Sequence, residues 1–244
     1  FDDPRVRKAF SLAIDRTYIV NQVTQSGQVE AGGFVPAGVY DAEGATGDDF
    51  RTVGGDYYKP TDADYEANCE EARALLAEAG YENGEGFPVV EYLYNTSDAH
   101  KAVAEALQYM WEEELGVKVT LNNQEWAAFL QTRKDGDYSI ARNGWIADYN
   151  DPISFLDMWM TGGGNNDAQY SNEEYDSLIK EAKTTTDVKE RMELLHKAED
   201  KIIGEDNALA PLYFYTQKYM LADGIEGMYY CPLGYFFFGY THQA

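Results

Sequence analysis

"VVEYLYNTSDAHKAVAEALQYMWEEELGVKVTLNNQ", residues 89–124, is the stretch that decides the fold. Its first residues, 89–94, are mostly β-branched or aromatic and predict a strand, and the helical pattern that follows ends at Gly116. "VKVTLNNQ" then alternates apolar and polar residues, as a half-buried strand does. A second helix, "EWAAFLQTRKDG", and a third strand, "YSIARNGW", come next. This alternation predicts an α/β fold in which a mixed β-sheet is flanked by helices.

Helical patterns also precede and follow this stretch. Apolar residues recur at helical spacing in "DDPRVRKAFSLAIDRTYIVNQV" and in "TDADYEANCEEARALLAEAGY", where Thr61 or Asp62 is the expected cap. Two further helices are predicted over residues 171–183 and 187–203. Residues 27–60 predict a long irregular connection, whereas the aromatic runs near the C-terminus predict strands. We therefore expect one α/β domain over residues 1–209 and a C-terminal segment, 210–244, that belongs partly elsewhere.

The composition excludes several classes of partner. The 244 residues include 43 acidic and 19 basic side chains, and the net charge of -24 disfavours nucleic acid and anionic membranes as partners. Cys69 and Cys231 lack the CxxC spacing of a zinc site and indicate no disulfide framework. The chain has no apolar run as long as a membrane span and no signal-peptide pattern at its start. It opens on a helix start at Asp3-Pro4, as a fragment of a longer protein would.

Motifs for enzyme chemistry are absent from the sequence. It contains no HExxH, GxSxG or phosphate-binding GKS or GKT motif, and its three histidines share no metal-ligand spacing. Close pairs of acids are frequent, but 43 acids produce such pairs by chance, and most charged side chains are solvated. We therefore predict neither a metal nor a cofactor. A hydrolase that uses Asp148 and Asp151 remains an alternative.

Those two acids lie in "NGWIADYNDP", residues 143–152. Asp151 precedes a proline and the apolar run "ISFLDMWM", so it is expected to be a helix N-cap, with Pro152 at the first helical position. Asp148 has no such structural explanation. It is either a solvated loop acid or the charged anchor of a binding site.

Cations and aromatic residues occur in the same part of the chain. Arg142 lies in a predicted strand and Arg133 near the end of a predicted helix, where each either pairs with an acid or holds a carboxylate. His100 lies in the first turn of a helix that follows a strand, where α/β folds bind their ligands, although its position alone favours a structural role. Trp126 and Trp145 either fill the core or form flat walls. An extended peptide, which carries both charges, would match such a set.

Several segments resemble a known family. "NTSDAHK", "NQEWAAFLQTRKDG", "ARNGWIADYNDPISFLDMW" and "NNDAQYSNEEYDSLIKEA", in this order, resemble the oligopeptide-binding proteins that serve ATP-binding-cassette peptide importers. The opening "DPRVRKAFSLAIDR" and the closing "APLYFYTQKYML" fit the same family, so the resemblance covers nearly the whole chain. It implies a periplasmic-binding-protein-like lobe: residues 1–209 would be the second lobe, and residues 210–244 would return toward a first lobe that is not in this chain.

The resemblance also implies roles for single residues. In the family, the acid of the "ADYN" turn holds the α-ammonium group of the peptide, and Asp148 matches it. Arg133, Arg142 and His100 match cations that meet the peptide's carboxylate, and Trp126 and Trp145 match walls of side-chain pockets. The predicted ligand-binding set also includes the neighbours of Asp148 in the turn, namely Ile146, Tyr149 and Asn150. Ile146 stands where well-known members have a cysteine, so a disulfide there is not expected.

The resemblance implies a non-enzymatic protein that captures oligopeptides outside the cytoplasmic membrane and delivers them to a membrane permease. We expect a monomer, whose signal sequence and anchor lie outside this chain. Within the same class, a binding protein for a dipeptide, a nickel chelate or a signalling peptide is the first alternative.

Overall fold

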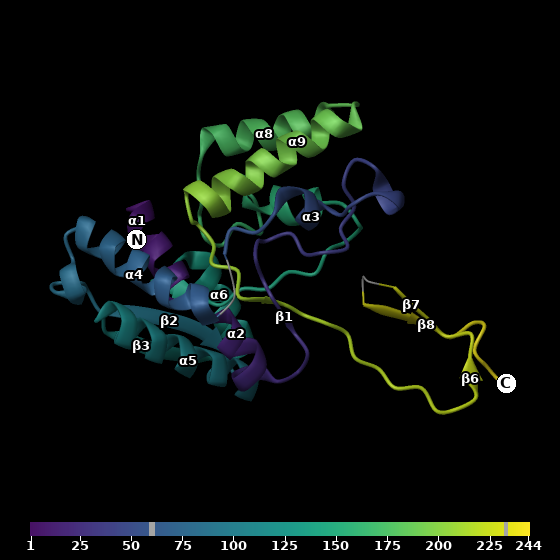
Figure 1. Ribbon diagram of the computed structural model, residues 1–244, viewed down its shortest axis with the longest axis horizontal. Helices are drawn as coiled ribbons and strands as arrows, with labels where there is room; N and C mark the ends of the chain where they lie inside the picture. The colour runs from purple at the N-terminus through teal and green to yellow at the C-terminus, as the bar shows by residue number, and fades with distance from the viewer. Residues whose placement is uncertain (59–61, 232–233) are drawn as a thin grey trace.

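The computed structural model describes residues 1–58, 62–231 and 234–244, and its largest sheet in these ranges has three strands (Figure 1). Strand β2 (Val90–Asn95) lies between β3 (Val119–Gln124) and β4 (Ile140–Ala141), and all three are parallel. The antiparallel pairs are found in separate two-stranded ribbons. The predicted α/β fold is therefore confirmed, although the third strand is shorter than "YSIARNGW" suggested.

Helices α5 (Asp98–Leu115) and α6 (Trp126–Asp135) connect these strands. The two connections cross the sheet in opposite directions, and right-handed crossovers therefore place α5 and α6 on opposite faces. Tyr92 of β2 packs on Trp111 of α5 at 5.9 Å between ring centroids, while Leu93, the next residue, points to the other face. Both helices end at a glycine with positive φ, Gly116 and Gly136.

The N-terminal part packs on the α5 side. Helix α1 (Pro4–Leu12) is capped by Asp3, whose carboxylate accepts the backbone N–H of Arg5. Helix α4 (Asp62–Glu78) packs against α1 and α5. Of its two predicted caps, Thr61 lies outside the described residues and Asp62 is the first residue of the helix. Trp111 donates its indole N–H to the carbonyl of Phe10 at 2.8 Å, which ties α5 to α1.

The second short helical stretch of the N-terminal pattern is present as α2 (Arg16–Tyr18) and the π-helical turn η1 (Ile19–Thr24). The described part of the predicted irregular connection, residues 27–58, contains only short elements: β1 (Val29–Glu30), the 3-10 turn η2 (Gly44–Thr46) and α3 (Phe50–Gly54). A 3-10 turn, η3 (Glu82–Gly84), follows α4.

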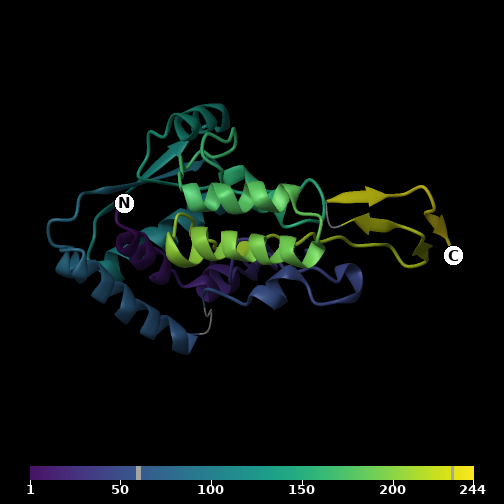
Figure 2. The same ribbon diagram turned by 90° about the horizontal axis from the view of Figure 1, so that it is seen from above.

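A helical hairpin covers the other end of the lobe. Helices α8 (Glu173–Thr184) and α9 (Val188–Glu199) lie side by side, close to their predicted positions (Figure 2). The π-helical turn η5 (Asp200–Glu205) continues α9. Before the hairpin come the short helix α7 (Ile153–Leu156) and the 3-10 turn η4 (Asp157–Trp159).

The segment 210–244, here called the C-terminal arm, leaves this body. Its strand β5 (Tyr213–Phe214) pairs antiparallel with β1, and the chain then runs away from the lobe (Figures 1 and 2). It ends in two ribbons, β6 (Ile225–Glu226) with β9 (His242–Gln243) and β7 (Tyr229–Cys231) with β8 (Tyr235–Phe237). Many of its large apolar side chains are exposed, among them Met220 at 96% and Tyr240 at 88%. Of the two runs predicted as strands here, only Tyr213–Phe214 of the first and Tyr235–Phe237 with His242 of the second form strands.

Candidate functional site

The carboxyl end of the parallel sheet gathers two of the predicted cations. Arg142 follows β4 directly, and its backbone N–H donates to the carbonyl of Leu93 in β2 at 2.8 Å. Its guanidinium donates to the side-chain oxygen of Asn95, the last residue of β2, at 3.4 Å. His100 lies one turn into α5, which begins just beyond the same strand. In a parallel sheet this edge is where ligands bind.

His100 lies where its ring is only partly solvated. Burial lowers the pKa of His100, and the positive charge of Arg142 lowers it further, against a smaller opposing effect of its hydrogen bond with the backbone of Asn95. Its Nδ1 atom is buried and has no hydrogen-bond partner among the described residues. In the described chain neither Arg142 nor His100 forms an ion pair with a carboxylate. An anion would therefore be stabilised at this edge.

Arg133 is different, because an acid of the chain already neutralises it. Its Nε atom donates to Asp167 at 2.7 Å, and the side chains of the pair are 13% and 14% exposed. Its Nη1 atom donates to the side chain of Asn143 at 2.9 Å and to the backbone carbonyl of Arg142 at 3.4 Å. The structure thus brings Arg133 next to the backbone at Arg142, where it holds the segment after β4 in place.

The turn that carries Asp148, residues 145–154, is fixed from inside by a buried serine. Ser154 accepts the indole N–H of Trp145 on its backbone oxygen at 2.6 Å, and its hydroxyl accepts the backbone N–H of Asp148 at 3.0 Å. The carboxylate of Asp148 is exposed and has no hydrogen bond or ion pair within the part of the chain that the structure describes. We call these residues the Asp148 turn.

Asp151 is occupied by the protein itself. Its carboxylate accepts the backbone N–H of Ile153 at 2.9 Å, as predicted, but the helix begins at Ile153 and its N-cap is Pro152, one residue later than expected. The same carboxylate receives both terminal nitrogens of Arg191, in α9, at 2.8 and 2.9 Å. Asp151 is therefore not a free partner for Asp148 in a two-carboxylate mechanism.

Among the other predicted residues of the site, some have partners within the chain and others are exposed to solvent. Asn150 uses both polar atoms of its side chain, accepting from the backbone of Tyr40 and donating to the carbonyl of Gly38. Tyr149 and Ile146 are 50% and 75% exposed. Trp126 is half exposed and stacks on Phe129 with ring centroids 5.8 Å apart.

Sequence reasoning missed Asn95, Ser154 and Arg191, which orient Arg142, the Asp148 turn and Asp151. Asn95 had a detectable signal, because it directly follows the strand predicted over residues 89–94. Ser154 and Arg191 lie in helical patterns that do not distinguish them from their neighbours.

No helix in the described ranges is long and apolar enough to cross a membrane. No three His, Cys, Asp or Glu side chains among those residues converge as metal ligands would.

Within the described residues, the lobe thus presents an exposed acid at Asp148 and, at the edge of its sheet, Arg142 and His100 without a carboxylate partner, an arrangement typical of a site for a charged ligand. Residues 1–167 match the model of the family described as bacterial extracellular solute-binding proteins, family 5 Middle. The chain belongs to this family. The predicted family is thereby confirmed, as is the prediction of a binding protein in place of a hydrolase.

Individual relatives agree with this assignment. The chain is 38% identical to the dipeptide-binding protein DppE of Bacillus subtilis over 96% of its length and 41% of that protein. It is 38% identical to the periplasmic oligopeptide-binding protein OppA of Salmonella typhimurium over 93% of its length and 39% of that protein. The crystal structure of Haemophilus influenzae OppA in complex with RPPGFSPFR matches with a TM-score of 0.75 and 33% identity, over 93% of this chain and 42% of that one. The chain therefore spans about two fifths of the length of these relatives.

Proposed function

We propose that this chain is one lobe of an extracytoplasmic protein that captures oligopeptides in a cleft between two lobes and delivers them to an ATP-binding-cassette importer. Two kinds of support come from the relatives. Relatives 38% identical to this chain are named as dipeptide- or oligopeptide-binding proteins, and one solved relative holds a peptide. The family is described as extracellular, which favours a location outside the cytoplasmic membrane.

The observation that carries the proposal is the exposed, unpartnered carboxylate of Asp148 on a turn whose backbone is fixed. Closing a second lobe over this turn would remove the carboxylate from water, which costs several kcal/mol unless a cation accompanies it. The α-ammonium group of a peptide supplies that cation. Asp148 would thereby select ligands with a free N-terminus.

The other end of the ligand is assigned to the sheet edge. Arg142 and His100 would meet the carboxylate of the peptide, and Arg133 would support Arg142 through the backbone. Trp126, Trp145, Tyr149 and Ile146 would line the path of the ligand's side chains. Hydrogen bonds to the peptide backbone give affinity without reading sequence, so we expect broad specificity.

The C-terminal arm is assigned to the contact with the preceding lobe. Its exposed aromatic side chains would be covered by a lobe that precedes this chain, and β1 with β5 would lie at the crossing. Because the ligand stabilises the closed state only by contacting both lobes, residues 1–244 alone should bind weakly. The complete protein is proposed to be a monomer, and its net negative charge here argues against nucleic-acid binding.

The test is calorimetry on the complete protein with alanine peptides of three to five residues, each free and N-acetylated. We expect acetylation and Asp148→Asn each to weaken binding by about 2 to 5 kcal/mol, the range for unpairing a buried charge. Equal binding of free and acetylated peptides would overturn the assignment of Asp148. The solute would then be sought among compounds without a free amine.

A further inference from the structure

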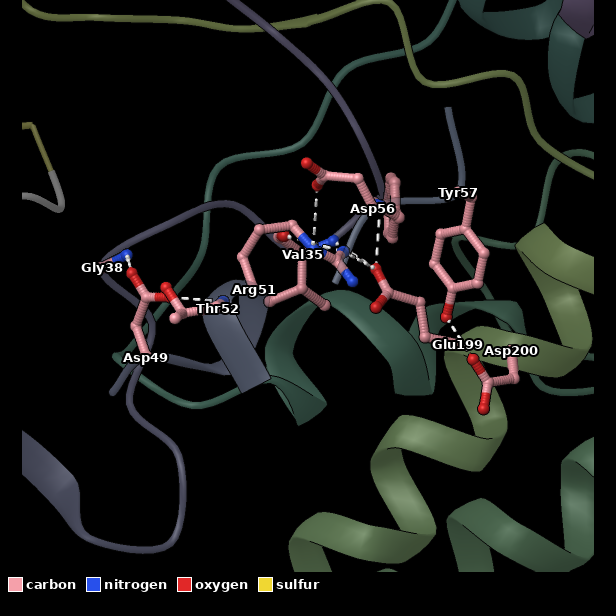
Figure 3. A network of polar contacts seen from close by, with 10 residues as sticks. Val35, Gly38, Asp49, Arg51, Thr52, Asp56, Tyr57, Glu199 and Asp200 are labelled. Carbon is pink, nitrogen blue, oxygen red and sulfur yellow. Dashed lines mark hydrogen bonds and ion pairs between the residues drawn. The ribbon is translucent and has the colours of Figure 1, made fainter. Parts of the chain in front are cut away.

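A buried carboxylate at the end of α9 fixes the loop that lies behind the Asp148 turn. The side chain of Glu199 is fully buried, and its Oε1 atom accepts the backbone N–H groups of Phe34 at 2.8 Å and Val35 at 2.9 Å. The same atom accepts Nη1 of Arg51 at 2.8 Å (Figure 3). Three donors on one buried charged atom make a rigid junction, because losing any of them leaves a charge or an amide unpaired.

Arg51 lies in α3, so its ion pair with Glu199 connects this helix to the end of α9. Its side chain is 8% exposed, and its Nε atom also lies 3.6 Å from Asp56. Burial by itself would lower the pKa of Arg51, but the hydrogen bond and the charge of Glu199 outweigh it and raise the pKa. A side chain at Gly33 would collide with the guanidinium of Arg51 and displace it from Glu199. The guanidinium therefore stays charged and held.

The N-terminus of α3 in turn fixes residues 38–40. Asp49 caps the helix by accepting the backbone N–H of Thr52 at 2.8 Å, and its other oxygen accepts the N–H of Gly38 at 2.6 Å (Figure 3). The carbonyl of Val39 accepts the N–H of Phe50 at 2.8 Å. Residues 38–40 are thus tied to α3 at two points.

Asn150 connects these residues to the Asp148 turn. Its side-chain oxygen accepts the N–H of Tyr40 at 2.8 Å, and its side-chain nitrogen donates to the carbonyl of Gly38 at 3.0 Å. On the other side of the turn, Asp151 is held by Arg191 of α9. Both connections lead back to α9, one through Arg191 and the other through Glu199.

From this geometry we infer that Asn150, with residues 38–40 behind it, is a positioning residue that sets where Asp148 meets the ligand, and is not itself a ligand contact. The inference rests on the proposed function of Asp148. Both polar atoms of the Asn150 side chain already have a backbone partner within the chain, and these two hydrogen bonds tie the turn to residues 38–40. The Asp148 carboxylate has no partner of its own in the described residues, so its place depends on the backbone of its turn.

The test compares Asn150→Ala with Asn172→Ala in the complete protein, with the same free and N-acetylated alanine peptides. Asn172 is a matched control: it also uses both polar atoms of its side chain within the chain, on two backbone N–H groups and on Asp206, and it lies at the start of α8, outside the Asp148 turn. Asn150→Ala should weaken binding of free peptides about tenfold, the lower end of the range for groups that orient a binding residue, and leave acetylated peptides unchanged. Asn172→Ala should leave the ratio of the two affinities unchanged.

The ratio of free to acetylated affinities distinguishes a positioning role of Asn150 from a ligand contact and from no role. If Asn150→Ala weakens free and acetylated peptides equally, Asn150 contacts the ligand and the inference is wrong; an unchanged ratio with unchanged affinities also overturns it. Combined with Asp148→Asn, Asn150→Ala should have no further effect on free peptides. If Asp148→Asn alone leaves the ratio unchanged, the proposed function of Asp148 fails. Should Asn150→Ala not fold, Asn150→Ser gives the same comparison with a smaller loss of packing.

Discussion

The carboxylates of Glu199 and Asp148 differ in their burial and in the partners that the chain gives them. Glu199 is fully buried, and the chain supplies its partners: Arg51 and two backbone N–H groups. Asp148 is exposed, and among the described residues its carboxylate has no partner, although the backbone on either side of it is held by Ser154 and Asn150. One acid completes the fold and the other is left available.

The chain has 43 acidic residues, and this difference distinguishes those with a structural role from candidates for ligand binding. A buried charge needs partners within the protein, because removing it from water otherwise costs several kcal/mol. An exposed acid on a flexible loop would need none. An exposed acid on a fixed turn is the unusual case, since the chain orders the backbone while the carboxylate itself stays free.

Removing the carboxylate of Glu199 should produce the largest effect. Glu199→Ala leaves Arg51 and the two amides unpaired inside the protein, and we expect unfolding to become easier by about 3 to 5 kcal/mol. Urea denaturation followed by circular dichroism measures this. Glu193→Ala, an exposed glutamate on the same helix, should change stability by less than about 0.5 kcal/mol. Equal effects of the two substitutions would contradict the assignment of Glu199 as a structural junction.

The two aspartates of the Asp148 turn give the next test. Asp151→Ala removes the two hydrogen bonds from Arg191 and the cap on Ile153, so it should destabilise the protein by about 2 kcal/mol. Asp148→Ala should stay within about 0.5 kcal/mol of the wild type. Thermal unfolding of both variants decides the matter. A destabilisation by Asp148→Ala as large as that by Asp151→Ala would show that Asp148 is also structural.

The smallest effect concerns pH. Burial and the charge of Arg142 hold the pKa of His100 below its ordinary value of 6.5. As the pH falls through 6.5, the unfolded chain therefore takes up a proton before the folded one does, so stability decreases from pH 6.5 down to the lower folded pKa and stays reduced below it. Titration of the His100 ring by NMR should give a pKa below 6.5. Arg142→Gln should raise that pKa, and an unchanged value would show that the two side chains do not sense each other.

Hydrophobic periodicity predicted most of the fold because it reports local burial. The strands β2 and β3 and the helices α5, α6, α8 and α9 lie close to where the pattern placed them. The shortness of β4 was not predicted, since pairing is limited to Tyr92 with Ile140 and Leu93 with Ala141. The number of paired residues depends on the neighbouring strand as well, so it cannot be predicted from the hydrophobic pattern of one strand alone.

The site was predicted through residue types and a resemblance, and the structure then separated residues that the sequence left equivalent. Arg133 and Arg142 were both candidates for a carboxylate, yet Arg133 pairs with Asp167, 34 positions further along. Asn150 was placed among the ligand residues because of its position beside Asp148. Its contacts with Gly38 and Tyr40, more than 100 positions away, explain it better as a support of the turn.

The sequence alone determined the α/β fold, the family and the hydrogen bond from Ile153 to Asp151. Periodicity and short-range hydrogen bonds depend on residues close together in the chain, and the family was predicted by resemblance. Only the tertiary structure decided which charges are neutralised. The partners of Glu199 lie 148 to 165 positions from it, and Arg191 lies 40 positions from Asp151. Whether a carboxylate stays free for a ligand depends on what the fold brings to it from such distances.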